Sequence, residues 1–582
     1  MRLRKLEVQN FRGIQSLNWL VPQDSNLVCL VGNGDSGKST ILDAIHLVLG
    51  DRWNPTLNDT DFFASDASTP IVIKAVVSDL PRGLLKESAF GLHLSGIDGA
   101  GTVTQDPVDG TDPCLIVQLR VDDSLEPVWT IERLDDEGES AELRAYHRRE
   151  FATFKVDDRV DSHLRWTRTS ALGRLSSSDG EAKSALAAAA RAARESIATL
   201  KDADLSDLTK NIQAKVNEVG SGTFTDIMPG LDASMSSGGN LALFEGAVPL
   251  TNYGLGTKRL AGIAIQQLAA GARTVLLIDE IEHGLEPHRV VRLIQHLRGD
   301  SSYSQIFMTT HSSVVVEQAS TPNLAIVRNL DGATRVLALP ASGGTALRLR
   351  RQRPSSFLAK RVLVVEGKTE EGLVKGLLEC WDRDRVLEGL SVSAGEGVVV
   401  QDGQGGSEAA PRAAALHALG FHSGAFLDND DRNVDAAVAK ALAAGVQIIR
   451  WPRGKNTELS LIESLNGCAL SSLLQLAVSI RGAEQAILDD LHRCHLPEIY
   501  RSIDIEEWLL AGEINLPGAR ELVADAAVRF SWFKSVDSGR ALGEWIYQHN
   551  FASPGSRFGD VLLEVRDFAY GPNAEILSGR DV

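Results

Sequence analysis

Acidic residues follow two short apolar runs in the second half of the chain. The run Leu363 to Val365 suits a strand buried on both faces, and Glu366-Gly367 comes directly after it. A second run, Gly424 to Leu427, ends in Asp428-Asn-Asp-Asp431. Because open α/β sheets gather ligands at the carboxyl ends of parallel strands, we expect these carboxylates at one sheet edge. Carboxylate oxygens suit Mg²⁺ and Mn²⁺, so the sequence predicts a divalent-metal site there.

A phosphate-binding motif lies near the N-terminus. The segment Gly32 to Ser39 fits G-x-x-x-x-G-K-S, follows the apolar run Leu27 to Val31 and precedes a helical pattern over 40–49. Backbone N–H groups and the helix N-terminus are expected to cradle phosphates. Lys38 would pair with the outer phosphates, and the Ser39 hydroxyl would hold Mg²⁺. The expected nucleotide-binding residues are Asn33, Gly34, Asp35, Ser36, Gly37, Lys38, Ser39 and Thr40.

Two later strand ends carry residues suited to nucleotide hydrolysis. The apolar run 274–278 ends in Asp279-Glu280. Asp279 is expected to help bind the Mg²⁺ of the nucleotide, and Glu280 to polarise the attacking water. A further buried run, 306–308, leads into His311, which is placed to sense the γ-phosphate. In this order after a phosphate-binding loop, these residues predict an ATPase.

The elements that position these residues require more than one domain, because 582 residues exceed what a single core accommodates. We expect the N-terminal half of an ATPase domain at 1–168, a helical insertion at 169–225 and the C-terminal ATPase half at 226–345. The carboxylate-bearing domain is expected at 346–582. Alanine density over 185–194 favours helix. The Gly/Ser-rich stretch 228–240 is predicted to be a flexible break.

Composition narrows the class of protein. The chain holds five Cys residues without a C-x-x-C pair, which argues for reduced thiols and a cytoplasmic protein. It has no apolar run long enough for a membrane span, so no membrane partner is expected. The net charge of −18 disfavours global nucleic-acid binding, and a local basic surface is needed instead. One basic segment suits either a DNA-binding surface or a solvated linker: Arg348, Arg350, Arg351, Arg353, Lys360 and Arg361.

With these motifs, residues 1–340 resemble a compact ATPase head of the ABC/SMC type, related to RecF-like repair proteins. The resemblance implies that Asn10-Phe-Arg12 lies near the nucleotide, with Arg12 among the nucleotide-binding residues. Gly254-Leu-Gly256 stands where such heads carry their signature loop, although it departs from the usual Ser-Gly-Gly form. Heads of this type sandwich ATP between two copies. The resemblance therefore implies a homodimer or higher homo-oligomer, with the helical insertion as a dimerisation element.

From about Phe357 onward the chain resembles a Toprim domain, and the full arrangement resembles the OLD family of ATP-dependent nucleases. Gabija-like defence nucleases are one subgroup with this layout. The implied fold class is α/β: an ABC/SMC-like ATPase domain followed by a Toprim domain with a parallel central sheet and C-terminal helices. Carried over motif by motif, the resemblance implies these metal-binding acids and a late lysine: Glu366, Glu370, Asp428, Asp430, Glu458 and Lys534. For the acid after the last strand, Glu458 fits best and Glu463 is the second candidate.

The function implied by the resemblance is an ATP-regulated DNA endonuclease, acting in anti-phage defence. Two Mg²⁺ or Mn²⁺ ions are expected in the Toprim site, as in-line phosphodiester cleavage requires, and one with ATP. DNA is the expected partner, with a helicase or retron protein encoded nearby as a further one. Three alternatives stay open. Topoisomerases and primases also use Toprim sheets, and an SMC/RecF-like repair ATPase or clamp would carry a Toprim domain without nuclease activity.

Overall fold

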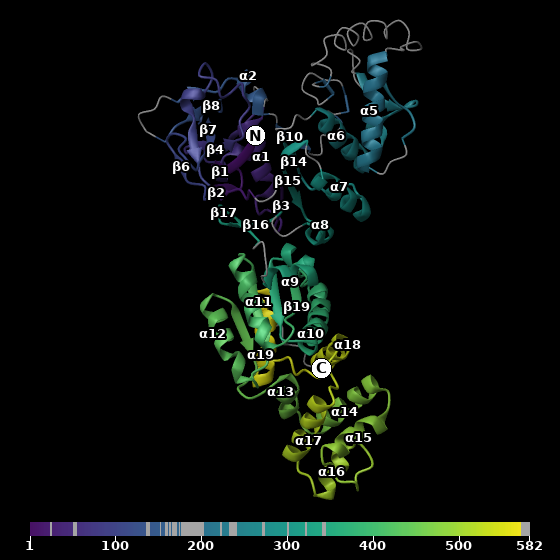
Figure 1. The fold of residues 1–582 in the computed structure, drawn as a ribbon. Helices are drawn as coiled ribbons and strands as arrows, with labels where there is room; N and C mark the ends of the chain where they lie inside the picture. Colours follow the sequence, from purple (N-terminus) through teal and green to yellow (C-terminus); the bar gives the residue numbers. More distant parts are fainter. Residues whose placement is uncertain are drawn as a thin grey trace. The chain divides into compact units, whose positions relative to one another are not determined.

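The protein forms two compact units, Met1–Ser342 and Gly343–Val582, in a computed structural model (Figure 1). The structure describes residues 1–23, 26–50, 55–134, 140–151, 153–156, 161, 164–165, 172–173, 175, 203–220, 224–231, 241–269, 274–299, 302–319, 323–339 and 345–571. Along the chain, the division between the units lies three residues before the expected boundary between the ATPase and carboxylate-bearing domains. Within the described residues, no helix is long and apolar enough to cross a membrane.

The first unit is built on one mixed sheet with the strand order β10-β14-β15-β3-β16-β17-β2-β1-β4-β7-β5-β6, to which β8 and β9 are added beside β7. Strands β10, β14, β15, β3 and β16 pair in parallel with one another, β16 pairs antiparallel with β17, and β2, β1, β4 and β7 pair antiparallel with one another. The bounds are β1 (Arg2–Phe11), β2 (Ile14–Leu20), β3 (Leu27–Val31), β4 (Ile71–Ser78), β5 (Ser95–Ile97), β6 (Val103–Thr104), β7 (Asp112–Val121), β8 (Pro127–Glu132), β9 (Ala141–Glu142), β10 (Thr153–Val156), β14 (Thr274–Ile278), β15 (Tyr303–Thr310), β16 (Leu324–Leu330) and β17 (Ala333–Ala338).

The parallel strands lie at one end of this sheet, and among them β3 and β14 are the most continuously apolar. Every residue of β3 and of β14 is buried, as expected for strands covered on both faces. Helix α1 (Lys38–Leu49) follows β3 and buries Ile41 and Ile45 in the same core cluster as Val28 and Leu30. The P-loop is thereby fixed between a buried strand and a buried helix.

Three helices of the first unit lie together: α5 (Ala203–Gly220) contacts both α6 (Leu255–Ala269) and α7 (Pro287–Gly299) (Figure 1). The predicted flexible break over 228–240 is wrong at its start. Residues 227–231 form strand β11 (Ile227–Leu231), which pairs antiparallel with the next strand in the chain, β12 (Leu241–Glu245). The remainder of that stretch, and the alanine-rich segment 185–194, lie outside the described residues.

The second unit contains a four-stranded parallel sheet with the order β19-β18-β20-β21. Its strands are β18 (Arg361–Val365), β19 (Val398–Asp402), β20 (His422–Leu427) and β21 (Gln447–Arg450). Three helices make the crossovers: α10 (Lys368–Leu387), α11 (Gly406–Ala418) and α12 (Asp435–Ala443). The chain leaves β18 for β19 on one side and then returns to β20 on the other. The topological switch point, where such sheets bind ligands, therefore lies between β18 and β20.

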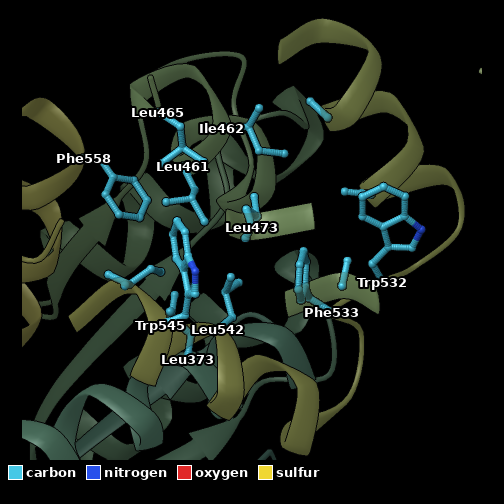
Figure 2. Close-up of a cluster of buried hydrophobic side chains, with 14 of the residues drawn as sticks. Leu373, Leu461, Ile462, Leu465, Leu473, Trp532, Phe533, Leu542, Trp545 and Phe558 are labelled. Atoms are coloured by element: carbon cyan, nitrogen blue, oxygen red, sulfur yellow. The ribbon is translucent and has the colours of Figure 1, made fainter. Parts of the chain in front are cut away.

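The C-terminal helices complete this unit. They are α13 (Thr457–Ser464), α14 (Gly467–Arg481), α15 (Glu484–Arg493), α16 (Ile505–Ala511), α17 (Leu516–Arg529), α18 (Val536–Gln548) and α19 (Arg557–Tyr570). Their apolar side chains join those of the sheet in one buried cluster, which Figure 2 shows around Leu461, Leu473, Phe533 and Leu542. The helices and the sheet thus fold as one body.

Helices α10 and α18 approach each other through glycines. A Cβ built on Gly372 would come within 2.2 Å of the Val536 carbonyl oxygen, and one on Gly543 within 2.4 Å of the Leu373 carbonyl oxygen. Contacts advance in the same direction along both helices, so the two run parallel and begin at the same end. The small residues let the backbones touch, which places the start of α18 beside the start of α10.

The basic segment before β18 is not a solvated linker. Residues 345–352 form helix α9 (Thr345–Gln352), in which Arg350 is buried. Arg353 bonds to the Val400 carbonyl oxygen and lies 3.4 Å from Glu371, and Arg361 donates to the Phe568 carbonyl oxygen at 2.8 Å. Arg348, Arg351 and Lys360 are exposed, so these three side chains are what this segment leaves at the surface for the predicted DNA contact.

Candidate nucleotide-binding and metal sites

The P-loop of the first unit is closed around its own lysine. Lys38 Nζ donates to the Gly32 carbonyl oxygen at 3.0 Å, the Asn33 carbonyl oxygen at 2.7 Å and Ser36 Oγ at 3.3 Å. Burial lowers the pKa of Lys38 to about 8, opposed by the charge of Asp279. Gly37 adopts a φ of 92°, which favours glycine at this turn into α1. A phosphate would replace the carbonyl oxygens as the partner of the ammonium group.

The residues expected to hold Mg²⁺ with the nucleotide are in contact. Ser39 Oγ donates to Asp279 Oδ1 at 2.9 Å, and Thr309 Oγ1 donates to the same oxygen at 2.6 Å. Glu280 comes next in the chain with a positive φ of 45°, and its backbone N–H donates to Thr309 Oγ1 at 2.8 Å. Its side chain is exposed directly after the end of β14, at the position where the sequence predicts the water-polarising acid.

His311 follows the end of β15 and is exposed. Glu282, three residues after Asp279, accepts hydrogen bonds from the His311 backbone N–H at 2.5 Å and from Thr310 Oγ1 at 2.7 Å. The loop after β14 and the loop after β15 are thus joined through one carboxylate, which the sequence alone did not single out.

Arg12 is tied into α1 rather than left open toward the P-loop. Its guanidinium bonds to Asp43 and, at 2.8 Å, to Asp61 Oδ1. Gly256 lies at the start of α6, where a Cβ would come within 2.1 Å of the Gly284 carbonyl oxygen. The loop that resembles a signature loop therefore packs closely on the segment after the Asp279-Glu280 pair.

In the second unit, the predicted acids come from three separate elements and meet at the switch point. Glu366 follows β18, and its Oε2 accepts from the Asp428 backbone N–H at 2.9 Å, directly after β20. Glu370 lies in the first turn of α10, whereas Glu366 lies in the turn between β18 and that helix. Glu370 Oε2 accepts from the Gly367 N–H at 3.0 Å, which caps the backbone at the start of α10. Two neighbouring strands and one helix therefore direct carboxylates to one edge of the sheet.

A threonine that sequence reasoning missed joins two of these acids. Thr457 Oγ1 lies 2.9 Å from Glu370 Oε1 and 3.2 Å from Asp428 Oδ1, and its backbone N–H donates to Asp428 Oδ1 at 3.0 Å. Trp451 Nε1 donates to the same hydroxyl at 2.8 Å. The signal in the sequence was the position of Thr457 beside Glu458, at the first turn of a helix that follows a strand end.

Glu458 and Lys534 lie close enough to interact. The positive charge of Lys534 lowers the pKa of Glu458, against a larger upward shift caused by burial. Glu458 is only 3% exposed, and its Oε1 has no hydrogen-bond partner among the described residues. Lys534 is held by its neighbour Phe533, which is buried in the cluster of Figure 2, and it precedes the cap of α18. The parallel contact with α10 positions this lysine near the acids.

Burial and mutual repulsion raise the pKa values of the gathered acids. Burial, followed by the charges of Glu370 and Glu366, raises the pKa of Asp428 to about 9. Burial also raises the pKa values of Glu366 and Glu370, the latter with a contribution from Glu458. Asp430 is exposed in the same loop, and its negative charge also raises the pKa values of Asp428 and Glu366. Such a group of acids is stabilised by protons or by cations.

The donor set fits hard divalent cations in its chemistry. Among the residues that the structure describes, no three Asp, Glu, His or Cys side chains are gathered tightly enough as they stand to enclose an ion. Each carboxylate nevertheless has two oxygens with about four lone-pair positions, and the hydrogen bonds given above do not use all of them. The buried Glu458 Oε1 is an acceptor without a donor, which a cation would satisfy. The residues that would hold such ions are Glu366, Glu370, Asp428, Asp430 and Glu458.

Comparison with known protein families shows which family the first unit matches. Residues 27–317 match the family described as "AAA domain, putative AbiEii toxin, Type IV TA system". The chain belongs to this AAA-domain family. The matched range contains the P-loop, Asp279-Glu280 and His311, so the first unit is an AAA-type ATPase domain that binds and hydrolyses ATP.

The AAA-domain chain is also similar to individual proteins. It is 36% identical over 113 residues to an OLD nuclease of Thermus scotoductus, which is 18% of this chain and 20% of that protein. Among solved structures, an Smc head bound to the C-winged helix domain of ScpA gives a TM-score of 0.37 at 17% identity, covering 60% of this chain and 100% of that one. The SMC head domain from Thermotoga maritima gives 0.31 at 14% identity, covering 58% and 100%.

Proposed function

We propose that this protein is an ATP-regulated, divalent-metal-dependent DNA endonuclease, with its hydrolytic centre at the switch point of the second unit and a Toprim-type arrangement there. The observation that carries the proposal is the meeting of Glu366 and Asp428, from adjacent parallel strands, with Glu370. The similarity to an OLD nuclease over part of the chain supports the same class of activity.

The chain's own residues have separate tasks in this reaction. Glu366, Glu370 and Asp428 would hold the ions, with Asp430 and Glu458 completing the set. Two such cations, when bound, supply the activation of water and the stabilisation of the leaving oxygen that in-line phosphodiester hydrolysis needs. Lys534 is free to approach the phosphate from the start of α18 and to balance its charge, a contribution of about 10²–10³-fold in rate by comparison with other electrostatic donors.

Regulation by ATP requires that the AAA domain change state with its nucleotide. Release of Lys38 from the Gly32 and Asn33 carbonyl oxygens on phosphate binding is the local change that the structure supports. A homodimer around ATP, and a role in anti-phage defence with a helicase or retron protein, belong to the same proposal.

The test is plasmid cleavage by the full chain with Mg²⁺ or Mn²⁺, with and without ATP. Glu366→Ala and Asp428→Ala should abolish nicking and cutting while nucleotide binding persists. Asp431→Asn is the matched control, because Asp431 is exposed beside the site and only caps the following turn. Cleavage that survives both alanine substitutions would overturn the proposal and leave an ATPase or clamp without a nuclease centre.

A further inference from the structure

Thr457 occupies an unusual place for a buried threonine. It is the first residue of α13, where the Asn456 side chain caps the helix by accepting from the Leu459 N–H at 3.0 Å. Thr457 is fully buried. Its hydroxyl therefore faces only protein groups, and two of these are carboxylates of the candidate metal site, Glu370 and Asp428.

The direction of the Thr457 hydroxyl proton is fixed by Trp451. The indole N–H of Trp451 donates to Thr457 Oγ1 at 2.8 Å and so occupies an acceptor position of that oxygen. A hydroxyl has one proton to donate, and here the remaining directions lead to the two carboxylates. Trp451 itself cannot turn away, because its ring stacks on Phe558 at 5.0 Å and packs edge-on against Phe426.

One hydroxyl thus sets the separation of two acids that come from different elements. Its one proton is shared between Glu370 Oε1 at 2.9 Å and Asp428 Oδ1 at 3.2 Å, while the Thr457 backbone N–H donates separately to Asp428 Oδ1. The second oxygen of Asp428 has no such bond among the described residues and is left for an ion. Glu370 at the start of α10 and Asp428 after β20 are therefore held in a fixed arrangement by the Thr457 hydroxyl, which is not itself an acid.

We infer that Thr457 is a positioning residue that fixes Glu370 and Asp428 relative to each other, so that both take up divalent cations as one preformed site. This inference rests on the proposed function of the same site. Without the hydroxyl, nothing in this group bridges the two carboxyl groups, and each ion must first bring them together. Groups of this kind, which orient metal ligands, contribute about 10–100-fold in metal affinity.

Thr457→Val is the direct variant, because valine fills the same volume without the hydroxyl. Thr457→Ser restores the hydroxyl and should restore binding. Ser460→Ala is the matched control: Ser460 lies on the same helix, is buried, and its Oγ has no partner among the described residues. Thr457→Ala gives a second variant without a hydroxyl and guards against a valine that does not fold.

The measurement is Mn²⁺ binding to the full chain without nucleotide, followed by electron paramagnetic resonance, and the relevant signal is the one that Glu366→Ala removes. We expect a rise in Mn²⁺ Kd of about 10–100-fold for Thr457→Val and Thr457→Ala, and wild-type values for Thr457→Ser and Ser460→Ala. In parallel, plasmid cleavage by Thr457→Val should require correspondingly more Mg²⁺, with its rate at saturating metal retained.

The outcomes separate the two proposals. If Glu366→Ala loses Mn²⁺ and cleavage while both Thr457 variants without a hydroxyl bind Mn²⁺ as the wild type does, the role of Thr457 is refuted and the nuclease centre stands. If Thr457→Ser fails to restore binding, the hydroxyl is not the cause and the inference is likewise refuted. If the wild-type chain neither binds Mn²⁺ at this site nor cleaves DNA, the proposed function itself fails.

Discussion

Replacing Asp428 with asparagine should make the metal-free protein less sensitive to rising pH. Burial and the charges of Glu370 and Glu366 raise the pKa of Asp428 to about 9, whereas an unfolded aspartate titrates near ~3.9. A carboxyl whose folded pKa is raised contributes stability that is fully present below the unfolded pKa. That contribution is lost as the pH rises toward and through the folded pKa.

The magnitude follows from proton uptake. Between the two pKa values, folding takes up about one proton at Asp428, so the free energy of unfolding falls by up to ~1.4 kcal/mol per pH unit. From pH ~6 to ~8 the loss is about 3 kcal/mol. A unit of this size loses roughly 2–4 °C in Tm per kcal/mol, which predicts a fall of roughly 6–12 °C from this group.

Asp428→Asn removes the titration and keeps the hydrogen bonds, because the amide oxygen can accept from the Thr457 N–H and hydroxyl as Asp428 Oδ1 does. Calorimetric melting in EDTA across this pH range should show a shallower decline for Asp428→Asn than for the wild type. Asp431→Asn, at an exposed cap of the same loop, should decline as the wild type does. Excess Mg²⁺ should stabilise the wild type most at high pH and leave Asp428→Asn nearly unchanged. Equal slopes for Asp428→Asn and wild type in EDTA would refute the reasoning.

Two further outcomes are expected. Lys38→Ala should weaken ATP binding at least tenfold in a fluorescent-nucleotide titration while Mn²⁺ binding in the second unit persists, and unchanged nucleotide affinity would contradict the P-loop assignment. Gly372→Ala should destabilise the second unit by about 1–3 kcal/mol in chemical denaturation, because its Cβ would come within 2.2 Å of the Val536 carbonyl oxygen. Gly467→Ala, whose Cβ would make only an ordinary 3.5 Å contact, is the control, and equal stability of the two variants would show that α10 and α18 need not touch.

The local parts of both sites could be predicted from the sequence. A fully apolar run followed by a glycine-rich or acidic turn and a helical pattern leaves few alternatives, and β3 with α1 and β18 with α10 follow that pattern. The placing of Glu366 beside Asp428 also followed from general rules, because parallel strands end at one edge. These statements depend on neighbouring residues in the chain and on one property of sheets.

Contacts between distant segments could not be predicted in the same way. Nothing in the local sequence distinguishes Thr457 from other threonines. Its role comes from the contact with Glu370, which is distant in the chain, and no periodic pattern in the sequence predicts such a contact. Arg350 belongs to a basic run, which suggested an exposed charge. It is nevertheless buried, because α9 is packed within the second unit. The strand β11 was hidden because Met228 to Leu231 contains a proline and a glycine, which usually mark turns.

The glycine contact between α10 and α18 has a mechanical consequence. At the glycines the two backbones touch directly, and Arg540 and Tyr547 of α18 also bond to Glu379 and Asp384 of α10, which opposes sliding of one helix along the other. Glu370 and Lys534, a negative and a positive charge at the starts of these helices, must then travel as a single rigid piece. Any motion of these helices would carry both charges together against the sheet that bears Glu366 and Asp428.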